Sequence, residues 1–286
     1  MNLNKYFGEE SIFIATHRAV LQKSLLNISN TEVTFDLSVK SINENNEDFV
    51  SVQFNNNEIV NFDLVIAADG IHSCTRKIIF PDIKLEYLNV STYRMLLEKP
   101  KGFNSVKFIL GNEGFMLLHP IDQFSLYCGI VFPSKKKEKL LFSDFIKIIK
   151  QFSESTKGIN FCNSSPILPG KMETVSAPVL AKGRIAFIGD ASHGCATSLQ
   201  QGAAQALEDS IVLSDFLDSG NILIALQKYT SARMKKISWV MEKSNNCMKI
   251  FNKKLTNLEK IDRNEKIKAE GLNSFILWQK LFNDDF

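Results

Sequence analysis

The sequence predicts a mixed α/β fold into which a second, antiparallel sheet is inserted. Two short apolar runs, 63–68 and 185–188, each end in a glycine-containing turn before helix-compatible residues, as buried strands of an α/β sheet do. Between them, 85–132 alternates apolar and polar residues over several segments, which is the period of half-buried strands. The 286 residues, 44% of them hydrophobic, suit one large domain or two joined ones.

Composition narrows the class of protein. The 34 basic and 31 acidic residues nearly balance at a net charge of +3, which gives no case for a nucleic-acid partner. We find no signal-peptide pattern and no apolar run long enough to span a membrane. The five cysteines are widely spaced without a C-x-x-C pair, so we expect reduced thiols in a cytoplasmic protein and no metal site.

The first pattern along the chain is a helix followed by a small antiparallel meander. Thr16 is a plausible N-cap for a helical pattern that runs to Leu26. Residues 33–39 and 50–54 alternate apolar and polar side chains, and an Asn-rich turn leads on to Ile59. We expect this meander to cover one face of the main sheet.

The run 63–76 reads as a buried strand that ends in Asp69-Gly70. Gly70 permits a tight turn at the carboxyl end of the strand. Ligands of α/β proteins bind at this end of the sheet. The run therefore predicts one wall of a binding site.

A second strand, 185–188, ends at Gly189 and is followed by Asp190. A helix is predicted to begin near Gln201, and its first turns contain Gly202 and Ala203. Such a helix start presents unpaired N–H donors and a partial positive charge. A carboxylate beside it can accept hydrogen bonds from ligand hydroxyls, so this stretch predicts a site for a large polar cofactor.

The remaining segments are assigned by the same patterns. Residues 111–114 form a hairpin turn within the second sheet, and His119 at a strand end is interpreted as structural rather than as a catalytic base. We expect a solvated connector at 134–139, a helix over 141–152 and a loop over 164–170. Helices are expected over 222–251 and in the tail 253–286.

Four motifs resemble one family. Gly189-Asp190-Ala191-Ser192-His193, followed by Gln201-Gly202-Ala203 and Leu207-Glu208-Asp209, is similar to the G-D-A-x-H segment of the FAD-dependent aromatic-ring monooxygenases, the para-hydroxybenzoate hydroxylase-like class. The run 63–76 resembles that family's D-x-V-I-G-A-D-G-x-x-S-x-x-R. His17-Arg18 with Leu21 resembles its H-R-x-x-L, and 226–233 resembles its L-x-x-Y-x-x-x-R. The chain departs from these patterns at Ala67, Thr197 and Gln200, where the family has glycine, proline and glycine.

The resemblance implies an incomplete Rossmann-like FAD-binding domain, residues 1–84 and 171–286, with an inserted substrate domain, 85–170. It implies FAD as cofactor and NAD(P)H as co-substrate. Asp190 would hold the ribityl chain, the amides near 201–203 would stabilise the charge of reduced flavin, and Arg18 would lie beside the pyrophosphate. The implied cofactor-binding residues are Arg18, Asp69, Gly70, Arg76, Gly189, Asp190, Gln201, Gly202 and Ala203, and no catalytic residue is assigned.

The expected function is hydroxylation of a small organic, aromatic substrate with NAD(P)H and O2. The 14 glycines include no pair separated by a single residue, so the sequence has no G-x-G-x-x-G turn. We therefore expect the N-terminal strand–turn–helix unit of the family to be missing. Two alternatives stay open: a non-catalytic remnant or subunit complemented by a partner chain that supplies this N-terminal half, and a flavin-dependent dehydrogenase or reductase of the same fold.

Overall fold

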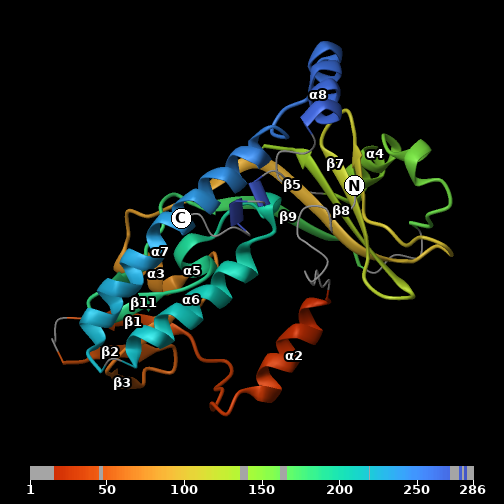
Figure 1. The fold of residues 1–286 in the computed structure, drawn as a ribbon. Helices are drawn as coiled ribbons and strands as arrows, with labels where there is room; N and C mark the ends of the chain where they lie inside the picture. Colours follow the sequence, from red (N-terminus) through yellow and green to blue (C-terminus); the bar gives the residue numbers. More distant parts are fainter. Residues whose placement is uncertain are drawn as a thin grey trace. The chain divides into compact units, whose positions relative to one another are not determined.

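The computed structural model describes residues 16–44, 48–135, 141–161, 166–218, 220–270, 277–278 and 280–281 (Figure 1). Its first half contains α2 (Arg18–Ile28), β1 (Val39–Asn43), β2 (Val50–Phe54), β3 (Ile59–Phe62), β4 (Val65–Ala67), α3 (Cys74–Ile79), β5 (Leu85–Glu98), β6 (Lys107–Leu110), β7 (Phe115–Pro120) and β8 (Ser125–Pro133). Its second half contains α4 (Phe142–Lys150), η1 (Ser153–Thr156), β9 (Leu168–Val175), β10 (Ala181–Lys182), β11 (Ile185–Phe187), α5 (Asp190–His193), η2 (Thr197–Leu199), α6 (Gly202–Leu217), α7 (Ile222–Lys249) and α8 (Asn257–Glu270). The predicted fold class, a helix and sheet mixture with an antiparallel sheet, is confirmed.

The chain divides into two compact units. We call Val33–Leu88 with Glu173–Met248 the parallel-strand unit. Asn89–Met172, with the segments up to Glu32 and from Lys249, forms the antiparallel unit. Two of these boundaries lie within a few residues of the predicted 84/85 and 170/171, whereas the terminal segments are grouped with the other unit. The assignment of functions to the two domains stays a prediction.

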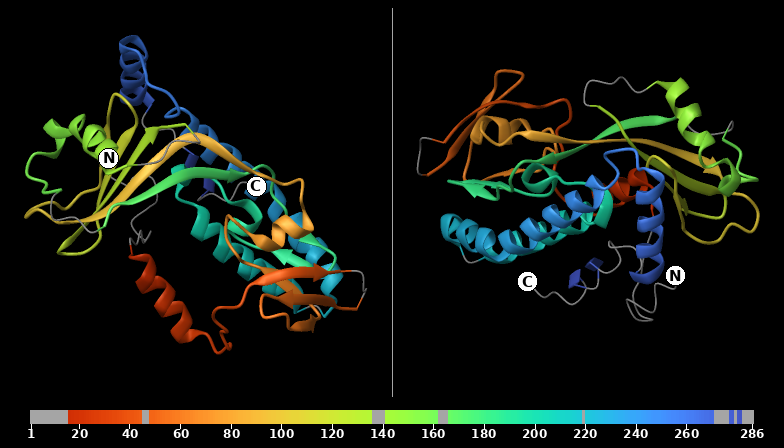
Figure 2. Two further views of the ribbon diagram at one scale, coloured as in Figure 1. Left: turned by 180° about the vertical axis from the view of Figure 1, so that it is seen from behind. Right: turned by 90° about the horizontal axis from the view of Figure 1, so that it is seen from above.

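The parallel-strand unit is built on a three-stranded sheet with the order β10-β11-β4. Its two long helices, α6 and α7, run side by side (Figures 1 and 2). β11 runs parallel to β4, with Ile185 beside Val65 and Phe187 beside Ala67. Ile185 and Phe187 pack in a core cluster with Val50 and Val52 of the meander. The other face packs against helices, since Ala186 clusters with side chains of α6 and α7, including Leu213, Tyr229 and Ile237. Burial on both faces explains why this strand is an unbroken apolar run.

The meander is shorter than the sequence predicts. β1, β2 and β3 form an antiparallel sheet in that order, but 33–38 is not a strand. Asp36 has φ +58°, a left-handed conformation that interrupts extended backbone. Phe35 is 74% exposed, so its alternation with polar neighbours did not reflect a buried face.

The antiparallel unit contains a five-stranded sheet with the order β6-β7-β8-β5-β9. One face is buried against α4, where Tyr93, Met116 and Ile130 cluster with Phe145 and Phe152. Of the predicted loop 164–170, residues 164 and 165 lie outside the described residues, and the prediction is wrong from Leu168 onwards, because β9 begins there. β9 is an edge strand, a position that tolerates a proline in the ladder.

The helices at the two ends of the chain differ in detail from their predictions. The N-cap of α2 is His17, whose side chain accepts a hydrogen bond from the Ala19 N–H at 3.3 Å, and not Thr16. None of the α2 residues is buried. In the tail, α8 is helical as expected, and residues 271–276, 279 and 282–286 of the predicted helical tail lie outside the described residues. Within the described ranges, no helix has both the length and the apolar character needed to cross a membrane.

Candidate functional site

The two strands that carry the strongest motifs end side by side. Since β4 and β11 are parallel neighbours, their carboxyl ends meet at one edge of the sheet. The Ile188 N–H donates to the Ala67 carbonyl at 3.1 Å, so the pairing continues past β11. Asp69 follows Ala67 by two residues and Asp190 follows Ile188 by two. The two predicted stretches therefore converge.

Arg76 links the segment after β4 to the segment after β11 through hydrogen bonds. Ser73 is the N-cap of α3 and accepts a hydrogen bond from the Arg76 N–H at 2.9 Å. The Arg76 side chain is buried, and its Nη1 donates to the carbonyl oxygens of Ala191 at 2.7 Å and Asp190 at 3.3 Å. Nη2 donates to the carbonyl oxygen of Ile71. The guanidinium thus holds the backbone after β11 against the backbone after β4.

Two carboxylates lie near this guanidinium at the open end of the site. Asp69 and Asp190 are both exposed, and Asp69 accepts a hydrogen bond from the Thr75 N–H at 3.0 Å. Burial lowers the pKa of Arg76, although the nearby charges of Asp69 and Asp190 favour its protonated form. Arg76 Nε is buried without a hydrogen-bond partner among the described residues.

The start of α6 is open, as the sequence predicts. Gln201 is its N-cap residue, and no side chain caps the helix. Gly202 and Ala203 are exposed. A Cβ on Gly202 would lie 3.7 Å from Asp190 Oδ1, so this carboxylate lies beside the free N–H groups of the helix. The arrangement offers donors, a partial positive charge and a carboxylate acceptor within one small region.

Two glycines permit the turns that form this region. Gly70 has φ +78°, with open space where a Cβ would stand. This position therefore needs glycine for its backbone conformation and not for lack of space. Gly189 has φ +57° and ψ −141°, a region that only glycine adopts readily. A Cβ there would also approach Ala206 Cβ to 3.0 Å. Gly189 therefore permits both the turn and the close approach of α6.

A buried polar network, to which the sequence patterns assign no role, connects the Gly189 turn with α6 and α7. Asp209 of α6 is fully buried. Its Oδ2 accepts a hydrogen bond from the Gly189 N–H at 2.9 Å and is 2.6 Å from His193 Nε2. Its Oδ1 accepts from Arg233 Nε of α7 at 2.8 Å. Arg233 also donates to Gln205 Oε1 at 2.7 Å and pairs with Glu208.

This network keeps the Asp209 carboxylate charged. Burial by itself would raise the pKa of Asp209, but the hydrogen bond and charge of His193, the Gly189 N–H and Arg233 outweigh it, so the pKa lies below its ordinary value. The available signal was in the motifs themselves, because Leu207-Glu208-Asp209 and the run 226–233, which ends at Arg233, are both among the segments that resemble the family.

Eight of the nine predicted cofactor-binding residues belong to one compact unit, and the ninth belongs to the other. The parallel-strand unit contains Asp69, Gly70, Arg76, Gly189, Asp190, Gln201, Gly202 and Ala203. Arg18 is the exposed first residue of α2 and belongs to the antiparallel unit, so its role stays a prediction. His119 is in β7, with Nδ1 2.9 Å from the Pro120 carbonyl oxygen.

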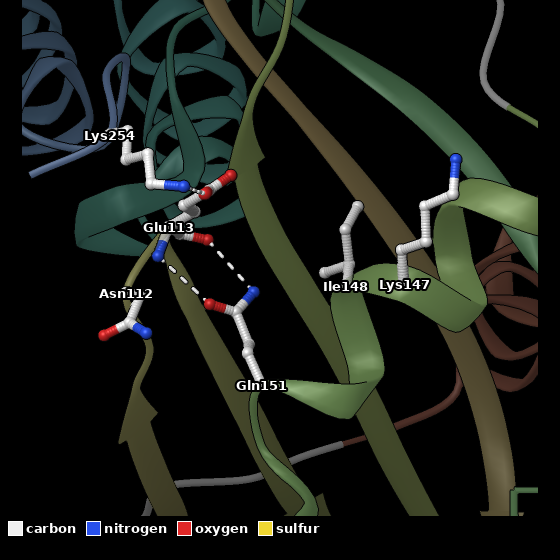
Figure 3. A pocket seen from close by; sticks show the side chains of 6 residues that line it. All are labelled: Asn112, Glu113, Lys147, Ile148, Gln151 and Lys254. Carbon is white, nitrogen blue, oxygen red and sulfur yellow. Dashed lines mark hydrogen bonds and ion pairs between the residues drawn. The ribbon is translucent and has the colours of Figure 1, made fainter.

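A pocket of about 250 Å³ lies elsewhere, in the antiparallel unit (Figure 3). Gln151 bonds to the backbone of Glu113 through Oε1 at 3.0 Å and Nε2 at 3.3 Å. Lys254 pairs with the Glu113 carboxylate at 2.5 Å, and Lys147 pairs with Asp144 at 3.5 Å. Each of the two lysines that line it therefore has a carboxylate partner, and the partner of Lys147, Asp144, lies outside the lining.

Comparison with known proteins identifies relatives. No family model matches the chain. A flavin-dependent monooxygenase from an unknown prokaryotic organism is 26% identical over 242 residues, 75% of this chain and 61% of the relative. An FAD-dependent monooxygenase of Aspergillus terreus is 27% identical, covering 64% and 50%. The 6-methylsalicylate 1-monooxygenase atA of the same fungus is 24% identical, covering 66% and 48%. The chain thus spans about half to three-fifths of the length of these curated relatives.

Solved structures share the fold. Klebsiella pneumoniae HpxO, complexed with FAD and uric acid, has a TM-score of 0.75 at 20% identity, covering 91% of this chain and 71% of that one. A salicylate hydroxylase substrate complex has a TM-score of 0.71 at 20% identity, covering 93% and 72%. The resemblance to the FAD-dependent aromatic-ring monooxygenases is confirmed by these relatives.

Proposed function

We propose that this chain, whose relatives and fold are those of the FAD-dependent aromatic-ring monooxygenases, contributes the flavin-holding part of an enzyme that hydroxylates a small aromatic substrate with NAD(P)H and O2. One observation carries the proposal: the exposed Asp190 carboxylate lies beside the uncapped start of α6. The relatives' names, which include a 6-methylsalicylate monooxygenase and a salicylate hydroxylase, favour an aromatic substrate.

The residues present fit FAD. A ribityl chain carries hydroxyl groups, and the Asp190 carboxylate can accept hydrogen bonds from them. Gly202 and Ala203 are exposed and no side chain caps this helix end, so their N–H groups suit an electron-rich or anionic ring edge. The small side chains of this first turn allow close approach of a ligand to the backbone. When bound, FAD supplies the redox and oxygen chemistry.

Three further residues would contact the ligand or hold the site in place. Arg76 hydrogen-bonds to backbone carbonyls and not to a carboxylate, so we assign it the role of holding Asp190 in place. Asp209 fixes the Gly189 turn from the buried side. Asp69, exposed and anchored to the Thr75 N–H, is positioned to contact a ligand at the same edge.

The test is binding of FAD to the purified chain. Asp190→Ala should abolish flavin binding, measured by titration calorimetry and by the visible spectrum of the bound flavin. Asp215→Ala is the control, because Asp215 is an exposed aspartate of α6 far along the helix from its start. Equal FAD affinity of the Asp190→Ala variant and the parent would remove Asp190 from the site.

A second candidate function is a complementing subunit, which the absence of a G-x-G-x-x-G turn from these 286 residues favours. In that case the chain alone takes up no flavin and gains a flavin spectrum when a separate polypeptide with that turn is added. Tight FAD binding by the chain alone would contradict it. A dehydrogenase or reductase of the same fold would instead oxidise NAD(P)H with an electron acceptor in the absence of O2.

We propose a location in the reducing cytoplasm, on the chemistry of the cysteines. Cys74, Cys128, Cys195 and Cys247 are all free thiols. A cytoplasmic location keeps such thiols reduced. Localisation of a tagged chain by cell fractionation tests this assignment.

A further inference from the structure

The five-stranded sheet of the antiparallel unit has a second face, opposite to the face that packs against α4. Successive side chains of a strand point to opposite faces, so Tyr93 and Met95 of β5 point to the α4 side and Arg94 points to the other. In the register of the sheet, Arg94 lies beside Gly129 of β8, and Gly129 lies beside Leu117 of β7. These three residues form one row across the second face.

Arg94 is an exposed cation of this row. Among the described residues, its guanidinium has neither a carboxylate partner nor a hydrogen-bond acceptor. A Cβ on Gly170 of β9 would lie 3.3 Å from Arg94 Nη2 and 3.1 Å from Thr92 Oγ1. Gly170 is not one of the glycines with a positive φ, so its lack of a side chain serves to make room for the guanidinium and not to permit a turn.

The side chain of Tyr127 fills the space above Gly129. Tyr127 is two residues before Gly129 in β8, so both lie on the second face. A Cβ on Gly129 would lie 2.9 Å from Tyr127 Oη and 3.0 Å from its Cε1, so a side chain at this position would displace the phenol. Burial raises the pKa of Tyr127, although the charge of Arg94 acts in the opposite direction. The hydroxyl therefore stays protonated at neutral pH, and among the described residues it has no hydrogen-bond partner.

Aromatic rings continue the same face. Phe115 of β7 points to it, since it lies beside Val131 of β8. The centroid of the Phe115 ring is 4.8 Å from that of Phe251, which follows α7, and 6.1 Å from that of Phe108 in β6. Such rings favour contact with a flat aromatic ligand. The polar group of that ligand is then selected by the cation and the hydroxyl on the same face.

We propose that the second face of the antiparallel sheet binds the aromatic substrate, and that Arg94 and Tyr127 select a substrate that carries a carboxylate. The inference rests on the proposed function and names the class of its substrate, an aromatic acid. A guanidinium binds a carboxylate through two parallel hydrogen bonds, and the Tyr127 hydroxyl can donate a third. A neutral amide of the same shape offers one acceptor oxygen in place of two, so the site discriminates by charge as well as by shape.

The test is the binding of two aromatic acids, salicylate and 4-hydroxybenzoate, to the purified full chain, each compared with its neutral amide by titration calorimetry. The parent should bind at least one acid tighter than its amide by about tenfold or more, because the charge-assisted contact is lost in the amide. Arg94→Met should remove this preference by weakening the binding of the acid and leaving that of the amide unchanged. Arg94→Lys should restore part of it, since lysine keeps the charge but not the planar fork.

Lys107→Met is the matched control. Lys107 is an exposed cation of the same sheet, but it lies beside Leu118, whose side chain packs on the α4 side. Its replacement should leave both affinities unchanged, and equal weakening by Lys107→Met and Arg94→Met would contradict a specific site. Tyr127→Phe keeps the ring and removes the hydroxyl, so it should weaken the binding of the acid by about three- to tenfold while the melting temperature changes little.

The remaining outcomes also decide. Equal affinity of the parent and Arg94→Met for the acids would overturn the proposal, and so would tighter binding of the amides than of the acids. Failure of the parent to bind either acid up to about 1 mM, the upper end of ordinary KM values, would overturn it too. None of these readouts involves flavin.

The failure of this inference can be told apart from that of the proposed function. An acid preference that depends on Arg94, in a chain that takes up no FAD, would refute only the proposed function. FAD binding that depends on Asp190, together with equal affinities for the acids and their amides, would refute only the inference drawn from the second face.

Discussion

Replacing Asp209 by asparagine tests whether the buried network holds the candidate site in place. The substitution keeps the size of the side chain and removes its charge. Asp209 accepts hydrogen bonds from the Gly189 N–H and Arg233 and pairs with His193. The asparagine NH2 would replace one acceptor oxygen, so one of these donors would lose its partner in a fully buried place.

The size of the expected loss of stability depends on the contacts that Arg233 keeps. Removing one member of a buried ion pair costs about 3–5 kcal/mol. Arg233 keeps its contacts to Gln205 and Glu208, so we expect the lower end, about 3 kcal/mol. At about 2–4 °C per kcal/mol for a domain of this size, the melting temperature should fall by about 6–12 °C.

The assay is thermal and urea unfolding, followed by circular dichroism and by the fluorescence of Trp239, which lies on α7 with Arg233. The control is Asp215→Asn, an exposed position of the same helix, which should change stability by less than about 0.5 kcal/mol. A loss no larger than that of the control would refute the network as a source of stability.

The same pair of proteins yields a pH test. The pKa of Asp209 in the folded chain lies below its ordinary value, so its contribution to stability is complete above the unfolded pKa of about 3.9. It is lost as pH falls through the lower folded value. The stability gap between the parent and Asp209→Asn should therefore narrow below about pH 4, and a gap that widens with acid would contradict the assignment.

Further predictions concern the turn and the thiols. Gly189→Ala should lower the free energy of unfolding by about 1–3 kcal/mol from backbone strain, and the contact of the new Cβ with Ala206 Cβ at 3.0 Å should add to this loss. Gly158→Ala is the control for strain alone, because Gly158 has a positive φ but open space around it. Equal losses of stability in the two variants would show that the close approach of α6 to Gly189 is unimportant. Burial raises the pKa of Cys195 to about 11 and of Cys128 to about 12. In a Cys162→Ser background at about pH 8, near the ordinary pKa of a thiol, the exposed Cys74 should react with a disulfide reagent well before either of them, and equal rates for all three would disprove that protection. The Asp190→Ala titration tests the site itself.

The sequence predicted the strands at 65–67 and 185–187, because a continuous apolar run that ends in glycine is typical of a buried strand. It also predicted the start of α6 near Gln201, because small residues follow a turn there and a helical pattern follows them. It failed at 33–38 because alternation alone does not show which side chains a fold buries. It also failed at Leu168, since an edge strand accepts the prolines that elsewhere predict a loop.

The grouping of residues far apart in sequence was decided by the tertiary structure. Local pattern located Asp69 and Asp190 at the ends of two strands, but only the parallel pairing of β4 with β11 places those ends together. The role of Arg76 as a link to the Asp190 and Ala191 carbonyls, and that of Asp209 as a buried acceptor for Gly189 and Arg233, arise from such pairing. Propensities and periodicity act over a few neighbouring residues, whereas these contacts span 20 to 115 positions, so they form only when the fold packs these distant segments together.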